Sequence, residues 1–71
     1  MQADGPNIRR LRERMGHGLN SFAQRAGISP SHLSRIERGL SGAQPEVIQL
    51  IAAELHVEVE LIIKEEVEKK S

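Results

Sequence analysis

The sequence predicts a mainly α fold of four to five short helices that ends in a β-strand. Three observations lead to this prediction. Apolar residues recur at helical spacing through the first 55 residues, and Gly and Pro mark the breaks between segments. A glycine at position 27 suits the tight turn between two of these segments. From Val57 onwards apolar residues occupy every second position, which is typical of a strand.

The length and composition indicate one small domain. The chain has 71 residues and no cysteine, so neither a disulfide nor a thiolate zinc site supports it. A chain of this size buries only about 60% of its unfolded surface, which makes association with a second copy a common support. No apolar stretch resembles a secretory signal or a membrane helix. We therefore expect a cytoplasmic protein without a membrane partner.

The first helix is expected over residues 6–15. Ile8, Leu11 and Met15 then lie on one face, at a spacing of three and four residues. The run Gly-His-Gly at residues 16–18 interrupts this pattern, so we expect the helix to end there.

The second and third helices are expected over residues 19–26 and 30–38. Phe22 is the only aromatic residue and belongs to the core at the centre of the second helix. Gly27 can adopt the left-handed conformation that ends a helix. Ser29 is a good N-cap, and a proline follows it at the first helical position. Two helices joined by such a short glycine turn form a helix-turn-helix, whose second helix enters the DNA major groove.

The segment from Ser29 to Gly39 resembles the recognition helix of the lambda-repressor/Cro-like helix-turn-helix family of bacteria, phages and plasmids. Leu33, Ile36 and Glu37 stand in the expected places. The resemblance extends without gaps from about Ile8 to Val57. It implies a repressor-like DNA-binding domain over residues 1–57, in which the second and third helices are the helix-turn-helix.

The fourth helix is expected to begin at Pro45, and its apolar face widens to include Leu50. The family often has a fifth helix after it, introduced by Ser or Asp. This chain has Glu58 there, so the alternation from His56 to Lys64 favours a strand over a helix. Residues 58–71 would then hold a strand for dimerisation and a charged tail.

The predicted strand would pair antiparallel with its copy in a second protomer. A two-fold axis at Leu61 places Val59 opposite Ile63, which joins apolar side chains. The residues expected at the dimer interface are Leu50, Val57, Val59, Leu61 and Ile63.

Positive and negative charges are segregated along the chain, although the formal net charge is zero. Residues 1–39 hold all seven arginines and carry a net charge of +4, and residues 40–71 carry −4. A basic surface within one part of the chain is what nucleic-acid binding requires, whatever the mean charge.

The candidate base-reading side chains lie on the outer face of the third helix, because Leu33 and Ile36 face inward. The resemblance implies that Pro30, Ser31 and Arg35 meet base edges, and an arginine can bond to two acceptors of guanine. Arg38 is expected at a phosphate, whereas His32 is either a DNA contact or a solvent-exposed residue. The residues expected to bind DNA are Leu19, Asn20, Ser29, Pro30, Ser31, His32, Ser34, Arg35 and Arg38.

Two departures from the family pattern remove phosphate contacts. The first residue of the second helix is commonly Gln in the family, and it is Leu19 here. The loop after the third helix often carries Lys or Arg, whereas residues 40–44 carry neither. Arg12 and Glu37 match family positions that often form a partly buried ion pair, and we expect the same pair here.

These patterns favour a dimeric, sequence-specific transcriptional regulator that represses by occluding a palindromic site on double-stranded DNA. The alternative is an antitoxin or another protein-interaction module of the same fold, which binds a toxin or other protein partner. An enzyme is not expected, because the three histidines show no metal-ligand spacing and no glycine-rich phosphate loop follows a strand. No cofactor or metal is expected either.

Overall fold

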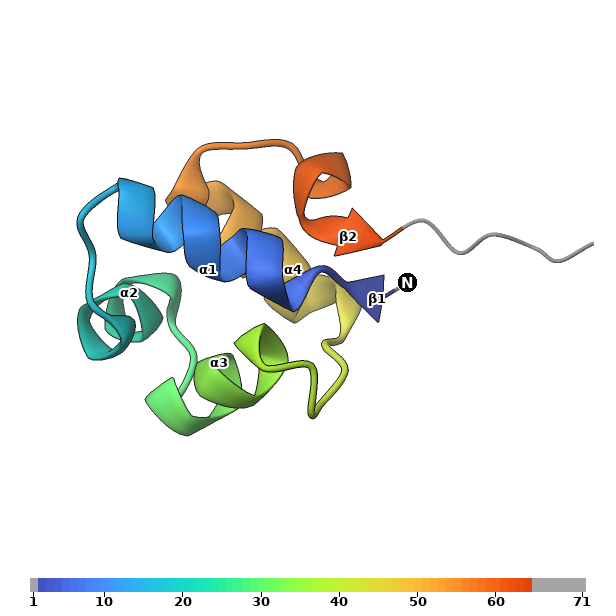
Figure 1. Cartoon of the computed structure of the whole chain (residues 1–71), viewed down its shortest axis with the longest axis horizontal. Helices are drawn as coiled ribbons and strands as arrows, with labels where there is room; N and C mark the ends of the chain where they lie inside the picture. Colours follow the sequence, from blue (N-terminus) through green and yellow to red (C-terminus); the bar gives the residue numbers. More distant parts are fainter. Residues whose placement is uncertain (1, 65–71) are drawn as a thin grey trace, which may run out of the picture.

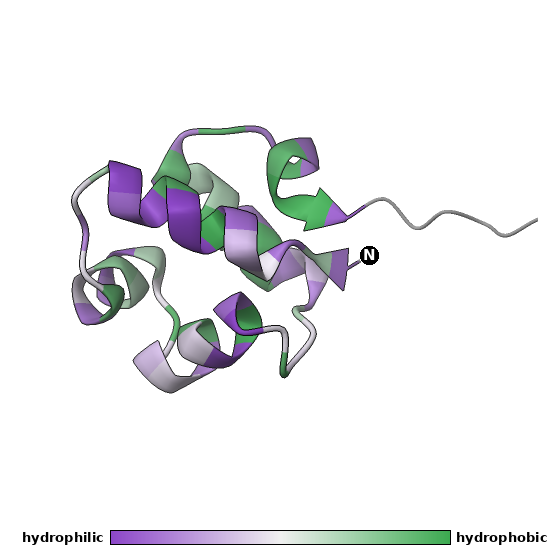
Figure 2. Ribbon diagram, in the orientation of Figure 1, coloured by the Kyte–Doolittle hydropathy of each residue, from purple (hydrophilic) through white to green (hydrophobic). Residues whose placement is uncertain are grey.

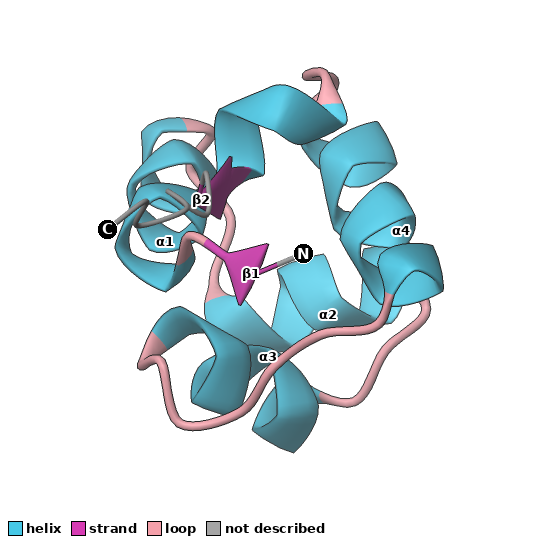
Figure 3. Cartoon of the chain, turned by 90° about the vertical axis from the view of Figure 1, so that its right-hand side faces the viewer, coloured by secondary structure: helices cyan, strands magenta, loops and turns pink. Residues whose placement is uncertain are grey.

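A computed structural model describes residues 2–64 of the chain (Figure 1). The elements, in chain order, are β1 (Gln2–Ala3), α1 (Gly5–Arg14), α2 (Leu19–Ala26), α3 (Pro30–Glu37), α4 (Pro45–Leu55), the 3-10 helix η1 (Val59–Ile62) and β2 (Ile63–Lys64). The pair α2 and α3 lies on one side of α1, and η1 with β2 lies on the other side (Figures 1 and 3). The mainly helical fold with a helix-turn-helix is therefore confirmed. None of the helices within residues 2–64 is long and apolar enough to cross a membrane.

The predicted helix boundaries agree with the structure to within one residue. Helix α2 spans the predicted residues, and α4 begins at Pro45. Helix α1 begins one residue early, at Gly5, because the Asp4 carboxylate accepts a hydrogen bond from the Asn7 backbone N–H at 3.4 Å. Met15 ends this helix and is 40% exposed, so it contributes less to the core than its spacing suggests.

The core is formed by apolar side chains from all four α-helices and from η1. Phe22, Leu33 and Ile36 are fully or almost fully buried, as the spacing predicts. Figure 2 shows apolar residues along η1 and β2, whereas the side of α1 that faces the viewer is hydrophilic. The buried apolar residues are Ile8, Phe22, Ala23, Ala26, Leu33, Ile36, Ile48, Ile51, Ala52, Leu55 and Ile62.

The start of α1 packs directly against the end of α3 at Gly5, a buried residue. A Cβ atom at this position would collide with the carbonyl oxygen of Ile36 and would lie 2.5 Å from that of Glu37. Only glycine permits this approach of the two backbones. The sequence analysis did not single out this residue, because the partner atoms belong to a helix that is distant in the chain.

The expected strand from His56 to Lys64 is wrong over most of its length. Residues Val59–Ile62 form a 3-10 helix, and only Ile63–Lys64 form a strand. A 3-10 helix brings residues three apart onto the same side, so Val59 and Ile62 both pack against the core. Alternation would have placed Ile62 on the opposite face from Val59, yet Ile62 is fully buried. Burial of Ile62 thus explains why a helical turn replaces the alternating strand.

The register expected with a second copy is also wrong, because Val59 lies in the 3-10 helix and cannot pair with Ile63 as a strand residue. The strand β2 pairs with β1 of the same chain instead. The two strands are antiparallel, with Ala3 opposite Ile63 and Gln2 opposite Lys64. Two further hydrogen bonds extend this contact: the Asp4 N–H donates to the Ile62 carbonyl at 2.8 Å, and the Asn7 side-chain amide donates to the Leu61 carbonyl at 2.6 Å. This edge of β2 is therefore occupied within the protomer.

The residues expected at a dimer interface differ in exposure. Val57, Val59 and Ile63 are partly buried and pack against the protomer's own core. Leu50 on α4 and Leu61 on η1 are 44% and 54% exposed. These two leucines remain available to a partner. The charged tail expected at residues 65–71 lies outside the described residues.

Candidate nucleic-acid interface

The turn between α2 and α3 sets the direction in which α3 presents its side chains. Gly27 ends α2 in the left-handed conformation, with φ of 83°, and its N–H donates to the Ala23 carbonyl at 2.9 Å. The Ser29 hydroxyl then accepts a hydrogen bond from the His32 N–H at 3.1 Å and caps α3. Because Leu33 and Ile36 are buried, the opposite face of α3 points outward.

The outward face of α3 and the start of α2 border one hollow of about 510 Å³. Seven of the nine residues predicted to bind DNA line this hollow: Leu19, Asn20, Pro30, Ser31, Ser34, Arg35 and Arg38. The other two are not part of its lining. Ser29 is exposed and caps the helix, and His32 is half-buried. For all nine residues, contact with DNA stays a prediction.

Two arginine side chains on the wall of this hollow make no ion pair within the described residues. Arg35 and Arg38 are both exposed, and no ion pair within residues 2–64 engages either of them. The ion pairs of that region involve Arg9, Arg12 and Arg25 instead. The two free guanidinium groups can therefore donate to an incoming acceptor such as a phosphate oxygen or a guanine edge.

Two helix N-termini open onto the same hollow. The cap of α2 is Gly18, which offers no side-chain hydrogen bond, so the N–H groups of the first turn are free to bind a ligand. The start of α3 lies opposite, at Pro30 and Ser31. Helix N-termini carry partial positive charge and attract phosphate groups. The partial positive charge at these helix starts adds to the charge of the two arginines.

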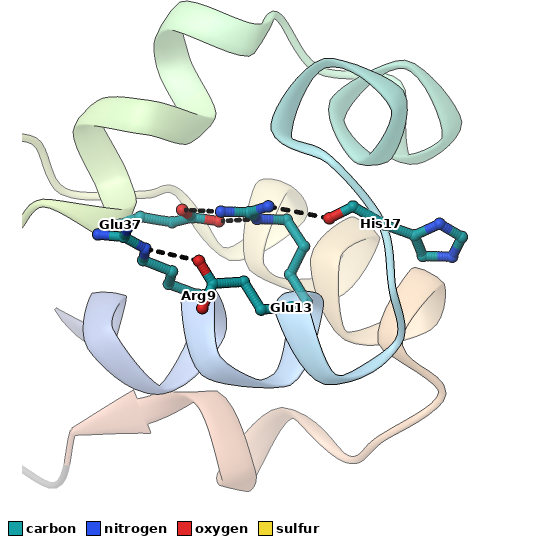
Figure 4. Close-up of polar contacts among 5 residues, drawn as sticks. Arg9, Glu13, His17 and Glu37 are labelled. Atoms are coloured by element: carbon teal, nitrogen blue, oxygen red, sulfur yellow. Dashed lines mark hydrogen bonds and ion pairs between the residues drawn. The ribbon is translucent and has the colours of Figure 1, made fainter.

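A buried ion pair holds α3 against α1 behind this surface (Figure 4). The Arg12 guanidinium donates to both carboxylate oxygens of Glu37, at 2.7 and 2.9 Å, and both residues are buried. The hydrogen bond with Glu37 raises the pKa of Arg12, against the opposing effect of burial. Arg12 and Glu37 thus form the pair expected from the sequence, and it is bidentate.

The same guanidinium also positions the loop that leads into α2. Its third hydrogen bond goes to the His17 carbonyl at 3.0 Å, next to the Gly18 cap. Arg12 therefore joins α1, the loop before α2 and the end of α3 in one contact network. The His17 ring packs near Phe22, with their ring centroids 6.2 Å apart. The network sets the relative positions of the two helix starts at the hollow.

The sequence analysis missed two residues that contribute to this arrangement. Gly5 seats α1 on the end of α3, and Asn7 ties α1 to the segment after α4. The Asp-Gly-Pro run at residues 4–6 carried a signal for a helix start, because Asp is a good N-cap. Nothing local in the sequence indicated the long-range partners of Gly5 and Asn7.

Within residues 2–64 no group of His, Asp and Glu side chains is arranged to hold a metal ion.

Comparison with known proteins identifies the family to which the chain belongs. The helix-turn-helix family model matches residues 8–62. The transcriptional regulator SlrR of Bacillus subtilis is 38% identical over 56 residues, which cover 78% of this chain and 37% of SlrR. The transcriptional regulator SinR of the same species is 32% identical over 62 residues, which cover 86% of this chain and 56% of SinR. The chain therefore spans from about a third to just over half the length of these relatives.

Two solved structures of SinR share the fold of this chain. One is SinR, described as a master regulator for biofilm formation, in complex with DNA. It has a TM-score of 0.76 and 33% identity, and the match covers 79% of this chain and 90% of that one. The other is a complex of the SinR and SinI proteins, with a TM-score of 0.78 and 33% identity, covering 80% and 56% of the two chains.

Proposed function

The chain belongs to the helix-turn-helix family, and we propose that it is a sequence-specific DNA-binding regulator of transcription, acting in the cytoplasm. One observation carries this proposal: two helix N-termini converge on the hollow beside α3, together with two arginines that no ion pair within residues 2–64 engages. The match to a relative that was solved in complex with DNA supports it. In the proposed mode α3 enters the major groove, and Arg35 reads a guanine through its two acceptors.

The exposed arginines and the helix N-termini at the hollow predict binding that depends strongly on salt, despite a net charge of zero. Each phosphate that the protein neutralises releases counterions, so the logarithm of affinity falls with the logarithm of salt concentration. The slope should be shallower than in family members whose loop after α3 is basic, because residues 40–44 carry no Lys or Arg. Affinity that stays constant between low and moderate salt would contradict this interface.

The direct experiment is selection of binding sites from random duplex DNA, followed by mobility shifts on the selected and scrambled sequences. Arg35→Ala should remove most of the preference for the selected sequence, since a bidentate arginine contact discriminates by about 1–3 kcal/mol. Arg25→Ala is the matched control, because Arg25 lies on the α4 side, 3.6 Å from Glu54. Loss of preference in both variants, or in neither, would refute the role of Arg35.

We further propose that two protomers associate and read a palindromic site, which occludes the promoter as a repressor would. The support is the exposure of Leu50 on α4 and of Leu61 on η1, two elements in contact with each other. Exposed leucines on neighbouring elements are suited to a second copy. In such a dimer the two α3 helices would lie about 34–36 Å apart on successive major grooves.

Sedimentation measures this association directly. Leu50→Lys and Leu61→Lys should each yield monomers, and each should weaken binding to a palindromic site more than binding to a half-site. Met15→Lys is the control, because Met15 is 40% exposed at the end of α1 and belongs to neither of those elements. An intact dimer in both interface variants would rule out this surface.

A second candidate function is binding of a protein partner, as an antitoxin or a partner-controlled regulator. One observation favours it: the fold matches SinR in its complex with the SinI protein. Selection from random DNA separates the two candidates. If no DNA sequence is enriched, the protein-binding function is favoured and the DNA-reading role of α3 is wrong.

A further inference from the structure

Two of the side chains that line the hollow, those of Leu19 and Pro30, are hydrocarbon, and we call this pair the apolar rim. Leu19 begins α2 and Pro30 begins α3, and both line the hollow. The remaining lining residues carry a hydroxyl, an amide or a guanidinium group. Leu19 is partly buried and packs against the core, so its side chain is held in place before any ligand arrives. A preorganised apolar surface therefore stands beside the polar and positive wall.

An apolar rim can distinguish the bases by one feature of their major-groove edges, the C5-methyl group. In the major groove thymine presents a C5-methyl group, and the other three bases present only hydrogen-bonding groups there. Placing a hydrogen-bonding edge against Leu19 would remove water from that edge and return no hydrogen bond. Burial of a methyl group against the same surface is favourable. The rim thus favours a pyrimidine that carries a C5-methyl group, whether thymine or 5-methylcytosine.

Resting on the DNA-binding function proposed above, the geometry points to Leu19 and Pro30 as a reader of the pyrimidine C5-methyl group within the recognised half-site. Pro30 and Arg35 are five residues apart in α3, which is about 7.5 Å along the helix. That length corresponds to about two base-pair steps at roughly 3.4 Å each. With α3 lying along the major groove, a methyl group beside Pro30 would then lie within about two base pairs of the guanine that Arg35 reads.

The test uses synthetic duplexes built on the sequence selected from random DNA. At each thymine of a half-site, thymine is replaced by deoxyuridine, which removes only the methyl group and leaves the pairing with adenine. At the same positions cytosine and 5-methylcytosine are compared opposite guanine. At one position the methyl group should raise affinity about fourfold in both comparisons, the ratio expected for burying one methyl-sized group.

Three variants assign this methyl effect to Leu19. In Leu19→Ala the ratio between the methylated and unmethylated duplexes should fall to about two or less, because only the Pro30 ring still contacts the methyl group. Leu19→Met should keep most of the ratio, since it restores a side chain of similar volume. Leu40→Ala should keep all of it, because Leu40 does not line the hollow. Each ratio compares the affinities of one variant for the two duplexes, so a general loss of stability or affinity in that variant cancels.

The outcomes separate this inference from the function on which it rests. If thymine and deoxyuridine bind equally at every position while a sequence is still selected, the methyl reader is wrong and the DNA-binding function stands. If the fourfold ratio survives in Leu19→Ala, the methyl group is read by other residues and the assignment to Leu19 is wrong. If no sequence is selected at all, both the function and the methyl reader are refuted.

Discussion

The helix-turn-helix unit (residues 19–37) and the chain-end unit (β1, η1 and β2) are held together in opposite ways. In the first, the hydrogen bonds that shape the turn connect near neighbours, such as Gly27 to Ala23 and His32 to Ser29. In the second, the hydrogen bonds join residues from the two ends of the described chain, with Asn7 and Leu61 54 positions apart. Local contacts form with little loss of loop entropy, whereas distant ones form only after the rest has folded.

The difference suggests a division of roles. The helix-turn-helix unit carries the exposed arginines and the start of α2, which no side chain caps, and its shape depends on caps and turns within its own sequence. The chain-end unit carries exposed Leu61 and depends on α1 and α4 for its position. Contacts through Arg12 and Gly5 connect α1 to α3, so α1 lies between the two units and links them.

The largest expected effect comes from the buried pair that anchors the helix-turn-helix unit to α1. Arg12→Ala and Glu37→Ala should each lower the free energy of unfolding by about 3–5 kcal/mol, because each leaves an uncompensated buried charge. The double variant should lose less than the sum of the two. Unfolding in urea, followed by circular dichroism, measures all three.

The exposed pair Arg9–Glu13 on the same helix is the matched control. Its atoms approach to 3.0 Å, but the side chains are 61% and 54% exposed. Arg9→Ala and Glu13→Ala should therefore change stability by about 1 kcal/mol or less. Equal losses at the buried and the exposed pair, or strict additivity at Arg12 and Glu37, would contradict the anchoring role.

The next effect concerns the close approach of α1 to the end of α3. Gly5→Ala should destabilise the domain by about 1–3 kcal/mol, because the new Cβ collides with backbone atoms that must move. Gly42→Ala should be nearly neutral, since open space surrounds that position. Thermal unfolding of the two variants compares them. Equal melting temperatures would show that α1 and α3 can move apart without a loss of free energy, so that the close contact at Gly5 does not hold them together.

A smaller effect tests the local character of the helix-turn-helix unit. Ser29→Ala removes the cap of α3 and should cost about 1 kcal/mol. Ser31→Ala, an exposed position in the same helix, should change stability by about 0.5 kcal/mol or less. Amide hydrogen exchange should show the loss of protection confined to α3 if the unit is locally determined. Loss of protection that extends to η1 and β2 would instead show that the two units open together.

The smallest effect tests the long-range character of the chain-end unit. Asn7→Ala removes the 2.6 Å hydrogen bond to the Leu61 carbonyl and should cost about 0.5 kcal/mol, because this hydrogen bond is exposed to solvent. Amide exchange should increase in β1, η1 and β2 and stay unchanged in α2 and α3. Asn20→Ala, which exchanges an exposed asparagine on α2, should leave the exchange of β1 and β2 as it is. If Asn7→Ala and Asn20→Ala have the same exchange pattern, the long-range role of Asn7 in the chain-end unit is wrong.

By itself the sequence determined the helices, the turn and the outward face of α3. The signals were local: Gly27 for the left-handed turn, Ser29 for the cap, and inward Leu33 and Ile36 that leave their helix neighbours outside. Each depends on backbone conformation or spacing within one helical turn, so a short stretch of sequence specifies it. The ion pair of Arg12 and Glu37 joins distant residues and was expected from the family resemblance.

Only the tertiary structure decided the conformation of the segment after α4 and the surroundings of Gly5. Alternation from Val57 onwards suits a strand, but the core had space for Ile62, which a 3-10 turn fills. The partner of β2 turned out to be β1, because the start of α1 brings that segment alongside. A short segment adopts the contacts that the remaining fold offers it, since its own preferences are worth less than the burial of one isoleucine side chain.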